Sequence, residues 1–407
     1  MSKAMSRLVR NCFERGRIPL LMGAPGVGKT AFANALGIEM GGTTVTVCFS
    51  HKDPVDVHGV TVVAAETVTV AGKQMKMVVS APPDWVVEAA NSTRPVVVLL
   101  DELTCVPPAT MAPVLDVLTS RVCGGVYLDP SRVAMMACAN PAEMAAGGWD
   151  LPPPMANRLT HLQYAVDPAE WAERFPSYWG NPPAIGFRTP DQSDAQWVAR
   201  QEGLADAWTA ARVKAATYIT LRPDQLLLFP KSRTDQAKAW PSPRSWDFVS
   251  RTVALAASDE LSAQDLADLV QGDIGAGPGA EFIHWMNKAD LADIPALFDH
   301  PAAFSLPGGI DGQYHLAVGI PAHVQTLQRR VATAKPAVLK KGREAAYEAG
   351  LDLLSRFRAA GGPKEMAALA VRTLRTECKP HERYADTGLS QFKDILDQAG
   401  GLTWAKA

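Results

Sequence analysis

The sequence predicts an α/β fold, a doubly wound parallel sheet with helices on both faces, followed by a helical region. In the first half, strand-like and helix-like segments alternate, as in a parallel sheet covered by helices. The apolar runs at 95–100 and 133–139 are uninterrupted, which is typical of strands buried on both faces. After residue 151 the segments are rich in Ala and Leu at helical spacing, and no internal repeat occurs.

The first strand, Ile18–Met22, leads into a glycine-rich loop and then a helix. Residues 23–30 read Gly-Ala-Pro-Gly-Val-Gly-Lys-Thr, which matches the phosphate-binding loop (P-loop) pattern G-x-x-x-x-G-K-[ST]. Its glycines allow successive N–H groups to surround phosphates. Lys29 is expected to neutralise the β- and γ-phosphates, and Thr30 to hold Mg²⁺. The residues predicted to contact ATP are Gly23, Ala24, Pro25, Gly26, Val27, Gly28, Lys29, Thr30 and Ala31.

A run rich in β-branched residues at 43–49 predicts the second strand, and the segment after it does not continue the alternation of strands and helices. Between 57 and 83, two β-rich stretches flank Ala-Gly-Lys-Gln, which predicts a β-hairpin inserted before the next helix. Asp84 is expected to cap that helix. Such an insertion either has a specialised role or is a surface hairpin without a function of its own, because surface connections tolerate insertions.

Two carboxylates, Asp101 and Glu102, directly follow the strand at 96–100. Ligands of parallel sheets bind at the carboxyl ends of the strands. Hydrolysis of a γ-phosphate needs one carboxylate for the Mg²⁺ shell and another to polarise the attacking water. We assign Asp101 to the first role and Glu102 to the second, and we predict a helix at 107–120 after them.

Two further polar residues stand where they would serve catalysis. Asn140 follows the strand at 133–139, where its amide would bond the γ-phosphate or orient the water, unless it only opens the turn before Pro141. Arg158 lies just after the proline break at 152–154 and would be presented to a neighbouring subunit, unless it is only a solvated surface arginine.

Composition shifts divide the chain into three predicted parts. Residues 1–165 form the P-loop core with its hairpin, 166–305 a linker and an α-helical lid, and 306–407 a helical region of unknown role. Asp167 is expected to begin the first helix of the second part, with Pro168 in its first turn.

Together these motifs resemble the AAA+ ATPases and, among them, the MoxR-like group. Residues 23–30 resemble the Walker A motif, 96–102 the Walker B motif and 137–141 the sensor 1 segment. Asn157-Arg158-Leu159 resembles the Asp-Arg-Phe segment that carries the arginine finger, with Asn and Leu replacing Asp and Phe. Ser242-Pro243-Arg244-Ser245 resembles the segment that opens the lid helix, which makes Arg244 the sensor 2 residue. The hairpin lies where this group carries its helix-2 insert.

The resemblance covers residues 1 to about 300 and implies a ring, usually hexameric, with ATP between subunits. It further implies that Mg²⁺-dependent hydrolysis is coupled to remodelling or activating a protein client, with a von Willebrand A domain protein as a possible partner. The catalytic residues would be Glu102, Asn140, Arg158 and Arg244, and the metal ligands Thr30 and Asp101.

Composition limits the partners and the cellular location that we expect. The 407-residue chain has a net charge of −2, which gives no electrostatic case for bulk nucleic-acid or membrane binding. No apolar run reaches the ~20 residues of a membrane span, no secretion signal is recognisable, and six scattered cysteines fit a reducing compartment. We therefore expect a cytoplasmic protein.

Three other functions stay open. A DNA-directed or defence-type NTPase motor also carries the insert, although no basic stripe with interleaved aromatics supports it. A small-molecule kinase is opposed by Glu102, Asn140 and the long helical half. A nucleotide-gated binding module is opposed by the intact Lys29, Asp101 and Glu102.

Overall fold

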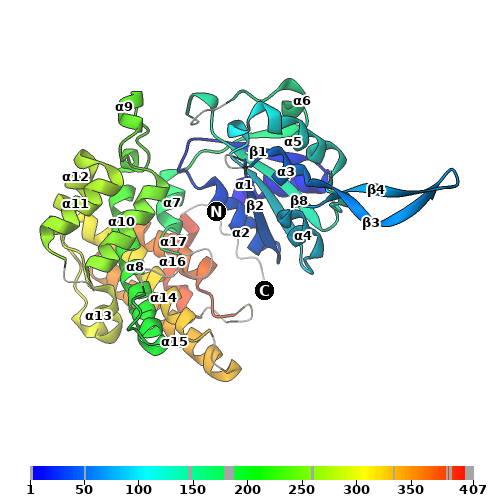
Figure 1. Cartoon of the computed structure of the whole chain (residues 1–407). Helices are drawn as coiled ribbons and strands as arrows, with labels where there is room; N and C mark the ends of the chain where they lie inside the picture. Colours follow the sequence, from blue (N-terminus) through cyan, green and yellow to red (C-terminus); the bar gives the residue numbers. More distant parts are fainter. Residues whose placement is uncertain are drawn as a thin grey trace. The chain divides into compact units, whose positions relative to one another are not determined.

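The computed structural model describes residues 3–49, 52–144, 149–177, 188–257, 261–332, 335–381, 384 and 387–398. The chain forms two compact units, Met1–Val166 and Asp167–Ala407 (Figure 1). Helices on both sides of residue 305 belong to the second unit. No helix among the described residues is both long and apolar enough to cross a membrane.

A five-stranded parallel sheet forms the centre of the first unit, which confirms the predicted fold class. Its strand order is β2-β5-β8-β1-β9, and every neighbouring pair is parallel. Because the strands are parallel, all their carboxyl ends lie at one edge. The strands are β1 (Ile18–Met22), β2 (Thr43–Cys48), β5 (Val96–Asp101), β8 (Val133–Ala139) and β9 (Leu159–Gln163).

Helices cover both faces of this sheet, as the continuous apolar strands require. Successive residues of β5 point to opposite faces of the sheet, and each face has its own hydrophobic cluster. Val97 and Leu99 belong to the first cluster, together with Phe32 and Val9. Val98 belongs to the second cluster. The first cluster joins α1 (Lys3–Glu14) and α2 (Lys29–Glu39) to one face. The second joins α4 (Asp84–Asn91) and α5 (Pro108–Ser120) to the other.

The predicted hairpin is present and longer than its sequence signal. After the short α3 (Pro54–His58), β3 (Val60–Val70) pairs antiparallel with β4 (Lys73–Ala81), and the ribbon extends away from the sheet (Figure 1). Ala71 and Gly72 both have positive φ, 51° and 78°, which is typical of a two-residue hairpin turn. A second, small hairpin is formed by β6 (Val122–Cys123) and β7 (Val126–Tyr127).

One predicted helix cap is wrong. Asp84 is the first residue of α4, and Pro83 precedes it as the N-cap with φ −67° and ψ 162°. The Asp84 carboxylate accepts a hydrogen bond from the Trp85 amide at 2.8 Å. The fixed φ of proline suits the extended N-cap conformation, which moves Asp84 into the first turn. Asp167, in contrast, caps α7 as predicted, since its side chain accepts from the amides of Ala169 and Glu170.

The second unit is helical, as predicted. Its central helix is α14, which packs against α8, α15 and α16. An aromatic cluster of Tyr218, Trp246, Phe282 and Trp285 joins α8 to α10 and α12. The helices are α7 (Pro168–Arg174), α8 (Asp194–Leu221), α9 (Arg233–Gln236), α10 (Pro243–Ala256), α11 (Ala263–Ile274), α12 (Ala276–Lys288), α13 (Ile294–Asp299), α14 (Ile310–Arg330), α15 (Pro336–Ala359), α16 (Lys364–Glu377) and α17 (Lys393–Gln398).

His315 of α14 is buried as a neutral imidazole, which predicts an acid-sensitive second unit. Burial and, secondarily, the nearby charge of Lys214 lower the pKa of His315 to about 4. The unfolded chain takes up this proton near pH 6.5, whereas the folded chain takes it up only near 4. The unfolded state therefore binds more protons in this window, so the free energy of unfolding falls as pH drops from 6.5 to 4.

The expected contribution of this group to that loss is about 3 kcal/mol. Urea unfolding at pH 7 and pH 4, followed by tryptophan fluorescence, measures it, because most of the ten tryptophans follow residue 167. The variant His315→Gln should lose correspondingly less stability between the two pH values. Equal losses in the variant and the wild type would show that His315 is not buried uncharged.

Candidate active site at the carboxyl edge of the sheet

The glycine-rich loop joins β1 to α2, and its last residues form the N-terminus of that helix. A Cβ at Gly23 would lie 2.2 Å from the Tyr164 carbonyl oxygen, so only glycine fits beside β9. Gly28 has φ 93°, a left-handed conformation, and serves as the N-cap of α2. The first helical bond runs from the Phe32 amide to the Gly28 carbonyl at 2.9 Å. The amides of residues 29–31 therefore lie at the helix N-terminus, where an anion is favoured.

The Lys29 ammonium is buried within this loop, with 8% of the residue exposed. Its Nζ donates to the carbonyl oxygens of Gly23 at 2.8 Å and Ala24 at 2.9 Å. It also donates to Asn140 Oδ1 at 2.7 Å, which links the loop to the end of β8. The acceptors of these three hydrogen bonds are two backbone carbonyl oxygens and one amide oxygen.

Thr30 meets Asp101 directly. The Thr30 hydroxyl donates to Asp101 Oδ2 at 2.7 Å, and Asp101 Oδ1 accepts from the Glu102 amide at 2.9 Å. A hydroxyl and a carboxylate side by side provide the hard oxygen ligands that Mg²⁺ prefers. The pair therefore fits the metal role assigned to it from the sequence.

Glu102 has a left-handed backbone, with φ 57° and ψ 39°. For a residue with a side chain this conformation costs on the order of 1 kcal/mol, and such strain is concentrated at functional sites. The conformation ends β5 abruptly and begins a short 3-10 helix, Leu103–Cys105. The backbone strain thus supports a functional role for this carboxylate.

Sequence reasoning missed the neighbours of Glu102 and Asn140. The Cys48 thiol lies 3.4 Å from Glu102 Oε2, because Cys48 stands opposite Asp101 in the β2–β5 register. Cys105 is a second cysteine near Glu102. Burial and, secondarily, the negative charge of Glu102 raise the pKa of Cys105, so its side chain stays a protonated thiol. The Thr104 hydroxyl donates to the Asn140 carbonyl at 3.0 Å. Cys48 lies within the strand predicted at 43–49, but the strand that neighbours it cannot be inferred from that run alone.

Arg158 is not brought to the loop of its own chain. The next residue, Leu159, pairs with Ile18 at the start of β1, whereas the loop follows Met22 at the other end. Five strand residues separate the two edges, roughly 15 Å. The Arg158 guanidinium donates to Thr119 Oγ1 at 2.8 Å and to the Pro154 carbonyl at 2.6 Å.

Arg244 belongs to the second unit, in the first turn of α10. Ser242 caps this helix, since its hydroxyl accepts from the Ser245 amide at 3.2 Å. The flanking residues 241–243 and 245–246 are buried, whereas Arg244 is exposed. The cap therefore fixes the start of the helix and leaves the arginine side chain at the surface of this unit.

No family model and no curated protein matches this chain. Solved structures do match. One is the Thermotoga maritima RuvB Holliday junction branch migration motor, with 12% identity, 76% of this chain and 79% of that one covered, and a TM-score of 0.32. Another is a putative ATPase from Cytophaga hutchinsonii, with 17% identity, 67% and 80% covered, and a TM-score of 0.29. A third is Brucella abortus NtrX in complex with ADP, with 15% identity, 87% and 68% covered, and a TM-score of 0.34. Likeness at this level says nothing about activity.

The chemistry of the site rests on its own geometry. Cys48, Asp101, Asn140 and the loop lie at the carboxyl ends of β2, β5, β8 and β1, four adjacent strands of the sheet. The arrangement joins backbone donors and a buried ammonium to a hydroxyl–carboxylate pair and a second carboxylate. It is suited to holding a polyphosphate with a divalent cation beside a base.

Proposed function

We propose that this chain is a Mg²⁺-dependent AAA+ ATPase of the MoxR-like group. It acts as a cytoplasmic ring, most simply a hexamer, that couples ATP hydrolysis to remodelling or activating a protein client. The observation that carries the proposal is the pair of contacts Lys29–Asn140 and Thr30–Asp101. They join the Walker A, Walker B and sensor 1 residues, which are far apart in the sequence, at one edge of the sheet.

In this proposal each residue has a distinct task. The amides of the loop and Lys29 bind the β- and γ-phosphates. Thr30 and Asp101 hold Mg²⁺, which neutralises charge on the phosphates when bound. Glu102 takes the proton of the attacking water, and Asn140 orients that water or the γ-phosphate. Arg158, at the opposite edge of the sheet, serves the next subunit, and Arg244 serves its own.

Phosphate release with ATP and Mg²⁺ tests the proposal, measured alone, with DNA and with a candidate von Willebrand A domain partner. We expect slow release alone, stimulation by the protein partner and no change with DNA. Stimulation by DNA would favour the motor instead. Phosphate transferred to a small acceptor would indicate a kinase, and ATP binding without turnover would indicate a nucleotide-gated binding module.

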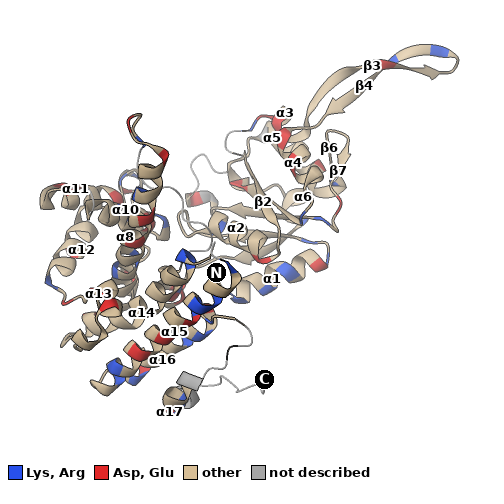
Figure 2. Cartoon of the chain, turned by 90° about the horizontal axis from the view of Figure 1, so that it is seen from below, with Lys and Arg blue, Asp and Glu red and all other residues tan. Residues whose placement is uncertain are grey.

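The β3–β4 hairpin is the proposed client-contacting element. Val63 and Val78 pair across it and are 63% and 65% exposed, and Met75 and Met77 of β4 are exposed as well. Methionines adapt to varied apolar surfaces. The charged residues of the ribbon are Glu66, Lys73 and Lys76, which leaves most of it neutral (Figure 2).

Replacing residues 67–77 with a short Gly-Ser turn should therefore leave ATP hydrolysis within several-fold of wild type and abolish client activation. Residues 67–77 are exposed except for the half-buried Val68, so the fold should survive their replacement. Circular dichroism, phosphate release and a client assay measure the three quantities. Lys73→Ala with Lys76→Ala is the control that keeps the methionines, and it should retain activation. Loss of folded protein in the turn variant would show that the hairpin is part of the core.

A further inference from the structure

Thr104 is a buried polar residue that lies two positions after Glu102, in the 3-10 helix Leu103–Cys105. Only 3% of the residue is exposed. The turn around it is closed by a hydrogen bond from the Cys105 amide to the Glu102 carbonyl at 2.8 Å. Because burying a hydroxyl is unfavourable unless it is hydrogen-bonded, the partner of Thr104 indicates what the residue does.

That partner is Asn140, which follows a different strand. Thr104 Oγ1 donates to the Asn140 carbonyl oxygen at 3.0 Å, although the two residues are 36 positions apart in the chain. The carbonyl of Thr104 in turn accepts from the Trp149 amide at 2.7 Å. Thr104 therefore connects the turn that carries Glu102 to the end of β8 and to the segment of Trp149.

The ladder of the sheet does not reach Glu102 or Asn140. In the register of β5 and β8 the last pair is Leu100 with Ala137. Both candidate catalytic residues lie beyond that pair, and the left-handed backbone of Glu102 ends the strand. Past the end of the ladder, the bond from Thr104 to Asn140 continues the connection between the two strand ends.

Asn140 is held from more than one side. Its side-chain oxygen accepts from Lys29 Nζ at 2.7 Å, and the carbonyl of the preceding Ala139 accepts from the Gly23 amide at 3.2 Å. Gly23 and Lys29 belong to the phosphate-binding loop. These two bonds fix the end of β8 to the loop, whereas the bond from Thr104 fixes it to the turn after β5.

We propose that Thr104 is a positioning residue of the ATPase. It holds the side-chain amide of Asn140 at the distance from Glu102 at which both groups contact the same attacking water. The inference rests on the proposed function, because a base and an orienting amide are needed together only where water attacks. A displacement of about 1 Å can cost ~10²-fold in rate. Thr104 acts through Asn140, so it affects turnover and not the binding of ATP by the loop.

Thr104→Val tests the inference, because it replaces the hydroxyl with a methyl group and keeps the branched shape. Phosphate release over a range of ATP concentrations with Mg²⁺ should give a kcat at least ~10-fold below wild type, whereas the ATP affinity measured by calorimetry should stay within about twofold. Thr104→Ser keeps the hydroxyl and should retain most of the wild-type kcat.

The matched control is Thr217→Val in the second unit. Thr217 of α8 is fully buried, and its hydroxyl also donates to a backbone carbonyl, that of Val213, at 2.8 Å. This variant removes the same kind of bond away from the sheet and should have the wild-type kcat. A loss of kcat as large as that of Thr104→Val would show a general effect of removing a buried hydroxyl and would overturn the inference.

A double-mutant comparison shows whether Thr104 acts through Asn140. In single turnovers with excess protein, Thr104→Val should slow hydrolysis at least ~10-fold in the wild-type background. In an Asn140→Ala background it should slow hydrolysis by less than about twofold, because the amide that Thr104 positions is absent. Equal factors in the two backgrounds would contradict an action through Asn140.

The outcomes separate this inference from the proposed function. Wild-type kcat in folded Thr104→Val, a loss that Thr104→Ser does not restore, or an equal loss of ATP affinity would overturn the role of Thr104 and leave the ATPase in place. No phosphate release by the wild type would contradict the proposed function and this role with it. Should Thr104→Val fail to fold by circular dichroism, Thr104→Ala and Thr104→Ser give the same comparison, because they differ only in the hydroxyl.

Discussion

Glu102→Gln is expected to lower ATP hydrolysis at least ~10²-fold while ATP still binds, the scale of positioned general-base catalysis. The change keeps the size and hydrogen-bonding capacity of the side chain but removes the base. Glu102 has a left-handed backbone, and its amide donates a hydrogen bond to Asp101. Neither feature depends on the charge of the Glu102 side chain, so the end of β5 should be preserved in the variant. Phosphate release measures turnover, and calorimetry with ATP measures binding.

Lys29→Ala should differ from Glu102→Gln in its effect on ATP binding, because it removes the buried ammonium and its bond to Asn140. Nucleotide binding should weaken, and hydrolysis should be lost with it.

The matched control for Glu102→Gln is Glu88→Gln, which changes an exposed glutamate on α4 and should behave as wild type. Turnover of ATP by Glu102→Gln at the wild-type rate would show that another group activates the water.

The features that could be predicted from the sequence are those that depend on residues close to one another along the chain. The loop at 23–30, the two carboxylates after β5 and Asn140 after β8 each follow a recognisable strand within a few residues. The hairpin was also predictable, because a turn between two β-rich stretches is a short-range signal. The Asp84 cap failed for a local reason too, since the preceding Pro83 already has the extended backbone of an N-cap.

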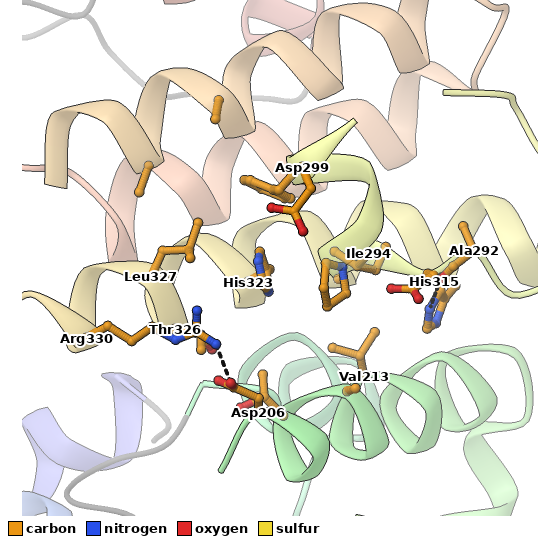
Figure 3. Close-up of a pocket in the computed structure, with 18 of the residues that line it drawn as sticks. Asp206, Val213, Ala292, Ile294, Asp299, His315, His323, Thr326, Leu327 and Arg330 are labelled. Carbon is orange, nitrogen blue, oxygen red and sulfur yellow. Dashed lines mark hydrogen bonds and ion pairs between the residues drawn. The ribbon is translucent and has the colours of Figure 1, made fainter. Parts of the chain in front are cut away.

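The features that could not be predicted depend on distant segments. Cys48 lies beside Glu102 only because β2 is the neighbour of β5, and strand order is not encoded in any single run. A cavity of about 890 Å³ in the second unit, between α8, α13, α14 and α15 (Figure 3), is lined from Asp206 to Ala349, so no window of sequence contains it. The left-handed backbone of Glu102 was likewise not predictable, because glutamate is not among the residues that favour this conformation.

The second large effect is expected at the two arginines, which we propose act in different chains. Arg158 lies at the amino edge of the sheet, roughly 15 Å from the loop of its own chain, so it can serve only a neighbour's ATP in the proposed ring. A guanidinium supplied by a neighbour to the charge developing on the γ-phosphate is worth ~10³ or more in rate. Arg158→Ala should therefore lose hydrolysis on this scale, and Arg7→Ala, an exposed arginine on α1, should not.

Mixing inactive proteins tests which chain each arginine serves. Arg158→Ala and Lys29→Ala should each be inactive alone, yet their mixture should recover part of the activity. In mixed rings the intact loop of one chain meets the intact Arg158 of another. Arg244→Ala mixed with Lys29→Ala should give no recovery, because each loop requires the Arg244 of its own chain. Recovery with Arg244→Ala but not with Arg158→Ala would exchange the two roles. Full activity of a folded monomer at high dilution, measured with its sedimentation, would contradict the ring and with it any action between subunits.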